Sequence, residues 1–239
     1  MWLALKLALA PLLVAQAIAT RRRAPTLPEA AGPRQGRLGE GERVLRLLIA
    51  GDSSAAGIGV AHQDQALAGH LTRALQRLAA CGVHWTLHAR SGLTTQQVHA
   101  LLRAEAPPAA DVAIVLTGVN DVIDQIPVRR AVMHRQALAD WLLGERGVAH
   151  VLFAPLPPVH RFPLLPQPLR RVMGDDARRH DDALAGWAAT RRDVSHIAIE
   201  LDVTPAAMAS DGFHPGEPVY RICGEALAAQ RSEERRVGK

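Results

Sequence analysis

Four short motifs in this chain carry side chains of the types that catalyse acyl transfer through a nucleophile. They are, in chain order, Gly51-Asp52-Ser53, Gly92, Gly118-Val119-Asn120-Asp121 and Asp211-Gly212-Phe213-His214. A nucleophilic hydroxyl needs a base to take its proton, and the base needs a partner that orients its ring. Ser53, His214 and Asp211 have the side chains for these three roles. A developing oxyanion also needs donors aimed at it, and Gly92 and Asn120 are suited to that role.

The order of these motifs resembles the SGNH (GDSL-type) hydrolase family, which is named for its Ser, Gly, Asn and His blocks. The likeness covers residues 43–230, and each motif falls where the sequence pattern ends a strand. One departure is Ser54, which stands where the first block of the family has leucine. The resemblance implies ester hydrolysis with Ser53 as nucleophile. It further implies an oxyanion hole formed by the backbone N–H groups of Ser53 and Gly92 and by the Asn120 amide.

Each site residue also has a purely structural interpretation. A serine after a strand and before a helix is a good N-cap, which is an alternative role for Ser53. Asn120 fits a turn, and His214 fits a loop histidine bonded to its own turn. The joint presence of all four motifs favours the catalytic interpretation. Asp52 and Asp121 are interpreted as acids that order the loops beside the site.

Other kinds of site have weaker support in the sequence. His84 and His88 share one face of a predicted strand, but four residues of strand span about 13 Å, too far for both to ligate one metal ion. The glycines after residue 50 lack the Gly-Lys-Ser/Thr ending of a phosphate-binding loop. No Gly-x-Ser-x-Gly nucleophile elbow occurs in the chain. We therefore expect no metal and no cofactor.

Apolar runs alternate with segments of helical spacing through the body of the chain. Predicted strands cover residues 43–50, 83–89, 111–116, 149–154 and 196–201, and predicted helices cover 66–80, 94–106, 129–143, 175–190 and 217–230. This alternation predicts βαβ units and an α/β fold with helices on both faces of a parallel sheet of about five strands. The family resemblance implies the flavodoxin-like, three-layer α/β/α form. Ligands of such sheets bind at the carboxyl ends of the strands, where the four motifs are expected to meet.

The N-terminal segment, residues 1–20, is apolar and has the length of a signal peptide, although a membrane anchor and an N-terminal amphipathic helix remain alternatives. We expect it to direct the protein to the cell membrane or to export, with membrane association through this segment. Arg21, Arg22 and Arg23 directly after it favour the cytoplasmic face. Residues 21–42 are rich in proline, glycine and charge and are predicted to be a linker to the hydrolase domain, residues 43–230.

The formal net charge of +5 does not indicate nucleic-acid binding. The three arginines at 21–23 contribute +3 and the last nine residues contribute +2, so the body of the chain has no basic excess. Those last nine residues, RSEERRVGK, resemble the in-frame translation of a sequencing adapter. We therefore expect residues 231–239 to be a non-native tail. Cys81 and Cys223 are expected to be two reduced thiols, with one disulfide as the alternative for an exported domain.

The sequence therefore predicts a metal-independent serine esterase that hydrolyses carboxylic esters of small molecules, lipids or carbohydrates. The alternative is a non-catalytic envelope-associated protein that keeps the hydrolase fold as a binding or scaffold module. A segment with six prolines between Ala154 and Arg171 is either a surface connection or a wall of the acyl pocket. The sequence does not predict the acyl and alcohol specificity or the oligomeric state.

Overall fold

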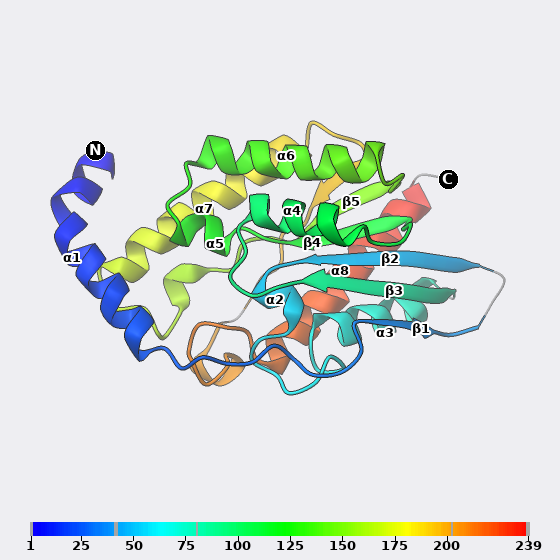
Figure 1. Ribbon diagram of the computed structural model, residues 1–239, viewed down its shortest axis with the longest axis horizontal. Coiled ribbons are helices and arrows are strands. Elements are labelled where there is room, and N and C mark those ends of the chain that lie inside the picture. The colour runs from blue at the N-terminus through cyan, green and yellow to red at the C-terminus, as the bar shows by residue number, and fades with distance from the viewer. Residues whose placement is uncertain (1, 41–42, 80, 202, 238–239) are drawn as a thin grey trace.

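The computed structural model describes residues 2–40, 43–79, 81–201 and 203–237 of the 239-residue chain. These residues form a six-stranded sheet with helices on both faces (Figure 1). The strands are β1 (Gln35–Leu38), β2 (Val44–Gly51), β3 (Gly82–Ala89), β4 (Val112–Leu116), β5 (His150–Phe153) and β6 (Val194–His196). The α-helices are α1 (Trp2–Arg23), α2 (Ser53–Ala56), α3 (Leu67–Ala79), α4 (Thr95–Glu105), α5 (Val119–Ile123), α6 (Val128–Gly144), α7 (Leu169–Ala188) and α8 (Glu217–Val237). Two short 3₁₀ helices are η1 (Val159–Arg161) and η2 (Pro205–Ala207).

The strand order is β1-β3-β2-β4-β5-β6, and every pair except β1–β3 is parallel. The predicted α/β class and the three-layer α/β/α arrangement are therefore confirmed. The sheet has six strands instead of about five, because β1 adds an antiparallel edge strand. This strand lies inside the segment predicted to be a linker. Its sequence, Gln-Gly-Arg-Leu, has no apolar alternation, and it is extended because it pairs with β3.

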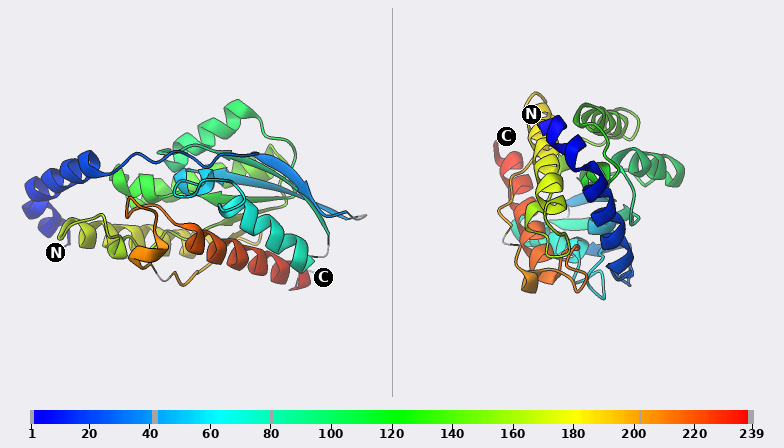
Figure 2. Two further views of the ribbon diagram at one scale, coloured as in Figure 1. Left: turned by 90° about the horizontal axis from the view of Figure 1, so that it is seen from below. Right: turned by 90° about the vertical axis from the view of Figure 1, so that its left-hand side faces the viewer.

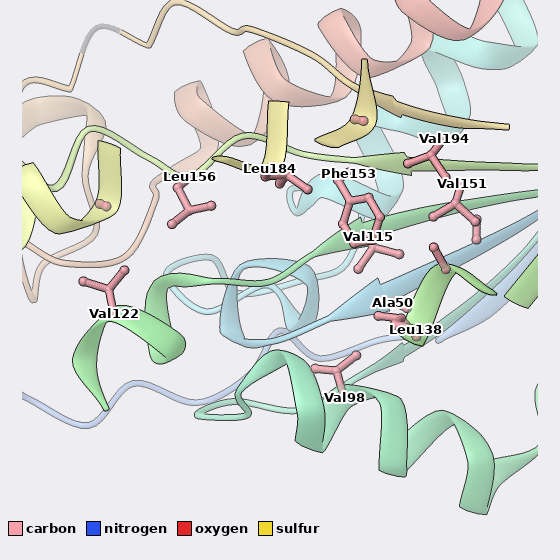
Figure 3. Close-up of a cluster of buried hydrophobic side chains, with 14 of the residues drawn as sticks. Ala50, Val98, Val115, Val122, Leu138, Val151, Phe153, Leu156, Leu184 and Val194 are labelled. Atoms are coloured by element: carbon pink, nitrogen blue, oxygen red, sulfur yellow. The ribbon is translucent and has the colours of Figure 1, made fainter. Parts of the chain in front are cut away.

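One face of the sheet is covered by α4, α6 and α7. Successive side chains of a strand point to opposite faces, so Ala50 of β2, Val115 of β4 and Phe153 of β5 lie on the same side. Figure 3 shows these side chains within a buried cluster that includes Val98 of α4 and Leu184 of α7. This cluster forms one half of the hydrophobic core.

The opposite face is covered by α3 and α8, which lie together on the other side of the sheet in Figure 2. Here Leu47 and Ile49 of β2 pack with Leu71 of α3 and with Tyr220 and Leu227 of α8. Because both faces of β2 are buried, this strand reads as an almost continuous apolar run in the sequence. A buried central strand gives the loops at its end a rigid support.

The N-terminal segment forms α1, which contacts the α7 layer at one end of the molecule (Figure 1). Lys6 pairs with Asp176 of α7, and the Gln16 amide donates to the Gln167 carbonyl just before that helix. Within the described residues, no helix has both the length and the apolar character needed to cross a membrane. The localisation that we expected from an N-terminal apolar anchor, at the cell membrane or exported, is therefore wrong.

Most predicted elements are present with shifted ends. The helix predicted over 66–80 is α3, and Ala80 lies outside the described residues. The strand predicted over 196–201 is the earlier and shorter β6, and the apolar Ile197 and Ile199 after it pack against the α3–α8 cluster without joining the sheet. Helix α7 begins six residues before its predicted start.

Gly51 at the end of β2 allows a close approach to β4 that no other residue permits. A Cβ atom at this position would lie 2.3 Å from the Leu116 carbonyl oxygen and 2.9 Å from the Ala55 Cβ atom. We expect Gly51→Ala to lower the free energy of unfolding by about 2–4 kcal/mol, because backbone must move to relieve the contact. Urea unfolding measures this loss.

The matched control is Gly186→Ala on α7, where an added Cβ meets nothing within 4 Å. Alanine is a better helix former than glycine, so this variant should be unchanged or more stable by up to about 1 kcal/mol. Equal stability of the two variants would contradict the close approach of β2 and β4.

Candidate active site

The register of the sheet brings three of the four motifs to one edge. Gly51 at the end of β2 pairs with Ala89 of β3 on one side and with Leu116 of β4 on the other. The three parallel strands therefore end at the same level. Ser53 begins α2 directly after β2, and Gly92 lies in the loop that follows β3. Asn120 follows β4, and this edge is the one at which α/β sheets bind ligands.

Ser53 is the first residue of α2, but its side chain is not the helix cap. The cap is Asp52, whose carboxylate accepts a hydrogen bond from the Ser54 N–H at 3.0 Å. The N-cap interpretation of Ser53 therefore does not describe this structure. In the described part of the chain, the backbone N–H of Ser53 donates to no protein acceptor, as expected for the first turn of a helix. Both the hydroxyl and the N–H of this residue are available for chemistry.

Asp211 and His214 form a tightly bonded pair in the loop before α8. The His214 Nδ1 lies 2.6 Å from Asp211 Oδ2, and Asp211 Oδ1 accepts the N–H groups of Phe213 and His214, each at 2.9 Å. Burial would raise the pKa of the Asp211 carboxyl, but these hydrogen bonds outweigh it and hold that pKa below its ordinary value. The carboxylate is therefore ionised and accepts a hydrogen bond from the Nδ1–H group of His214. This tautomer leaves Nε2 of the ring to act as a base.

Two neighbouring segments hold the Asp211–His214 loop in place. A Cβ atom on Gly59, which follows α2, would lie 2.2 Å from the Pro215 carbonyl oxygen, so the loop packs directly on the α2 turn. On the other side, the Leu164 N–H donates to the Gly212 carbonyl at 3.1 Å. Phe213 also packs edge-on against Phe162, with ring centroids 5.1 Å apart. The histidine loop is thus fixed between α2 and the proline-rich segment.

Ser53 and His214 border one cavity of about 70 Å³. In the described part of the chain, no hydrogen bond joins the Ser53 hydroxyl to the His214 ring. Such bonds often form only when substrate is bound. Pro155, Pro157 and Phe162 also line this cavity, so the proline-rich segment forms part of its wall.

Gly92 lies in an open part of the edge. Its φ of +81° falls in the left-handed region that favours glycine, and an added Cβ would meet nothing within 4 Å. Its N–H donates to no acceptor among the described residues. Directly after it, Thr94 and Gln97 form a capping box at the start of α4. A Thr-x-x-Gln spacing is a sequence signature of such a box, so it was readable from the sequence.

The Asn120 amide connects the segments that follow β2, β3 and β4. Its Nδ2 donates to the Leu93 carbonyl at 3.0 Å and to Asp52 Oδ2 at 3.3 Å. One side chain from the β4 loop therefore contacts the loops after β2 and β3. In this state the amide hydrogens bond to the protein scaffold, and the longer bond to Asp52 is the weaker of the two.

Asp121 and Arg135 form a buried pair beneath the site. Asp121 accepts the Thr95 N–H at 2.9 Å and the Thr95 hydroxyl at 2.6 Å, and its Oδ2 lies 3.5 Å from Arg135 Nη2. Sequence reasoning did not single out Arg135. Its position was readable, because it shares the buried face of α6 with Ala131 and Leu138 at helical spacing.

The chain matches the model of a GDSL-like lipase/acylhydrolase family over residues 49–222. It belongs to that family. The matched segment contains all four motifs of the site. A search of curated proteins finds no significant match.

Solved structures with the same fold include several esterases. A family 3 carbohydrate esterase from Clostridium thermocellum aligns with a TM-score of 0.63 at 14% identity, over 82% of this chain and 100% of that chain. A lipolytic protein of the G-D-S-L family from Veillonella parvula aligns with a TM-score of 0.59 at 16% identity, over 79% of this chain and 97% of that chain. An acetyl xylan esterase from Geobacillus stearothermophilus aligns with a TM-score of 0.54 at 17% identity, over 78% of this chain and 94% of that chain. At these identities the similarity establishes the fold. Family membership supports an esterase or acylhydrolase activity.

The buried carboxyl of Asp52 makes stability depend on pH. Burial is the main cause that raises its pKa from 3.8 to about 7, and the nearby Asp121 adds to the effect. Between these pH values the folded state binds a proton that the unfolded state has lost. Stability should therefore fall as pH rises from about 4 to about 7. Asp52→Asn removes this dependence, and its stability relative to the native protein should rise over the same window by as much as about 4 kcal/mol.

Urea unfolding at pH 4.5 and pH 8 tests this expectation. The control is Asp182→Asn, because Asp182 is an exposed residue of α7. Its stability difference from the native protein should be nearly the same at both pH values. A constant difference for Asp52→Asn as well would show that Asp52 is ionised throughout.

Proposed function

We propose that this protein is a metal-independent serine esterase that cleaves carboxylic esters through an acyl-enzyme on Ser53. The observation that carries the proposal is the arrangement around one cavity. The Ser53 hydroxyl is free of a capping role, and the Asp211–His214 pair borders the same space. This arrangement supplies a nucleophile, a base and an orienting acid.

In this mechanism the Ser53 hydroxyl attacks the carbonyl carbon of the ester. His214 Nε2 takes the hydroxyl proton and passes it to the oxygen of the leaving alcohol as the C–O bond breaks. Asp211 keeps the ring in the correct tautomer and stabilises the imidazolium. Water then attacks the acyl-enzyme, with His214 again as the base, and the carboxylic acid leaves.

Three donors are proposed to stabilise the oxyanion. They are the N–H groups of Ser53 and Gly92, which donate to no acceptor in the described chain, and the Asn120 amide. The long Asn120–Asp52 hydrogen bond of 3.3 Å is the one that the oxyanion would replace. Preorganised donors of this kind act in the transition state and cost little reorganisation.

We expect Ser53→Ala to lower kcat for p-nitrophenyl acetate by several orders of magnitude, because it removes the nucleophile. Ser54→Ala should retain most of the activity, since this neighbouring hydroxyl has no role in the mechanism. Steady-state kinetics with and without EDTA provide the measurement, and the native rate should be the same in both. A similar loss in the two folded variants would contradict the assignment of Ser53.

Asn120→Ala should lower kcat by about 10²–10³ with little change in KM, as the loss of one transition-state donor does. The variant also loses the bonds to Asp52 and Leu93, so thermal unfolding must be measured beside the kinetics. Gln97→Ala is the control. It removes the hydrogen bond from the Thr94 N–H, next to the Leu93 carbonyl that Asn120 contacts, without removing an oxyanion donor. A raised KM with unchanged kcat would instead assign Asn120 to substrate binding.

A further inference from the structure

The cavity beside Ser53 has an almost entirely apolar lining. Apart from Ser53, Ser54 and His214, its walls are alanine, leucine, valine, proline, methionine and phenylalanine side chains together with Tyr220 and Cys223 of α8. Such walls offer nothing to the hydroxyl groups of a sugar, whose burial without partners is unfavourable.

The two polar groups that α8 brings to the cavity are neutral. The Tyr220 hydroxyl donates to the Ile58 carbonyl at 2.7 Å, so the ring presents only carbon to its surroundings. Burial raises the pKa of the Cys223 thiol to about 12, so the sulfur is present as a thiol and behaves as a small apolar group. Cys223 is therefore a wall of the cavity and not a second nucleophile.

The mechanism indicates which part of an ester this space receives. Water enters along the path by which the alcohol leaves, so the leaving-group side must be open to solvent. The acyl chain, in contrast, stays attached to Ser53 through both steps. The open side of the site is at Gly92, where the neighbouring Arg90 and Ser91 are exposed. The apolar cavity is on the side of α8.

We infer that the cavity between the ends of β4 and β5 and helix α8 is an acyl subsite for unbranched aliphatic acyl groups of about four to six carbons. This inference rests on the proposed function and adds its substrate class. The cavity volume is about 70 Å³, and one water-sized group needs about 10–15 Å³ on this measure, so about five to seven atoms fit. A hexanoyl group places five carbons beyond its carbonyl. A dodecanoyl group exceeds the space.

The test is the kcat/KM of p-nitrophenyl esters from acetate to dodecanoate. Each buried methylene should raise kcat/KM by about two- to fourfold. Hexanoate has four more methylenes than acetate, so it should exceed acetate at least about tenfold, and dodecanoate should fall again. Cys223→Met adds two heavy atoms to the wall and should lower the hexanoate-to-acetate ratio about tenfold. Thermal unfolding checks that the variant is folded.

Cys81→Met is the matched control. Cys81 is likewise a free thiol. It is buried near α3, whereas Cys223 is partly exposed, and it does not line the cavity. This variant should leave the hexanoate-to-acetate ratio unchanged, even if its stability falls. An equal change of the ratio in both variants would mean that Cys223 acts only through stability and would overturn the subsite.

A second series of alkyl acetates varies the alcohol and keeps the acyl group constant. We expect a weak dependence on alcohol length. A flat acyl profile with a steep alcohol profile would assign the cavity to the alcohol and overturn the inference while leaving the serine mechanism intact. A flat response in both series would overturn the inference alone, whereas hydrolysis that persists in Ser53→Ala would overturn the proposed function.

Discussion

Two buried carboxylates hold the loops of the proposed active site together. Asp52 is hydrogen bonded to the Ser54 N–H and to the Asn120 amide, and so joins the loops after β2 and β4. Asp121 is hydrogen bonded to Thr95 and paired with Arg135, and so joins the β4 loop to the start of α4 and to α6. These bonds therefore fix the positions of the segments after β2, after β3 and after β4 relative to one another.

Burying these charges is costly, and the costs are distributed unevenly. Asp121 and Arg135 are both fully buried. The attraction between their opposite charges compensates part of the cost of removing each from water. Asp52 has no comparable cation beside it, and its pKa of about 7 reflects this. A protein that only needed stability would gain by removing such a group. Because Asp52 bonds both to the Ser54 N–H and to the Asn120 amide, we interpret it as a group that positions the proposed site at some expense in stability.

The sequence was sufficient for the elements that bury apolar surface by local periodicity. The apolar run that forms β2 and the helical spacing in α3 give a direct signal, and the motif order predicted which loops meet at one edge of the sheet. The edge strand β1 could not be predicted, because its four residues become extended only by pairing with β3. The role of Asp52 as the cap of α2 depends on a backbone turn that composition does not specify. For α1 the apolar composition suggested an anchor, but Lys6 and Gln16 bond to the body of the protein, and membrane-spanning character is absent from the described helices.

The central claim is that Ser53 is the nucleophile served by the Asp211–His214 pair. The most direct measurement is to treat the native protein with a fluorophosphonate and to locate the adduct by peptide mass spectrometry, with residual esterase activity followed in parallel. The account predicts one adduct per chain, on Ser53, formed in step with the loss of activity. An adduct on Ser54 or on another residue in an inactivated protein would contradict it, as would full esterase activity in a protein completely labelled at Ser53.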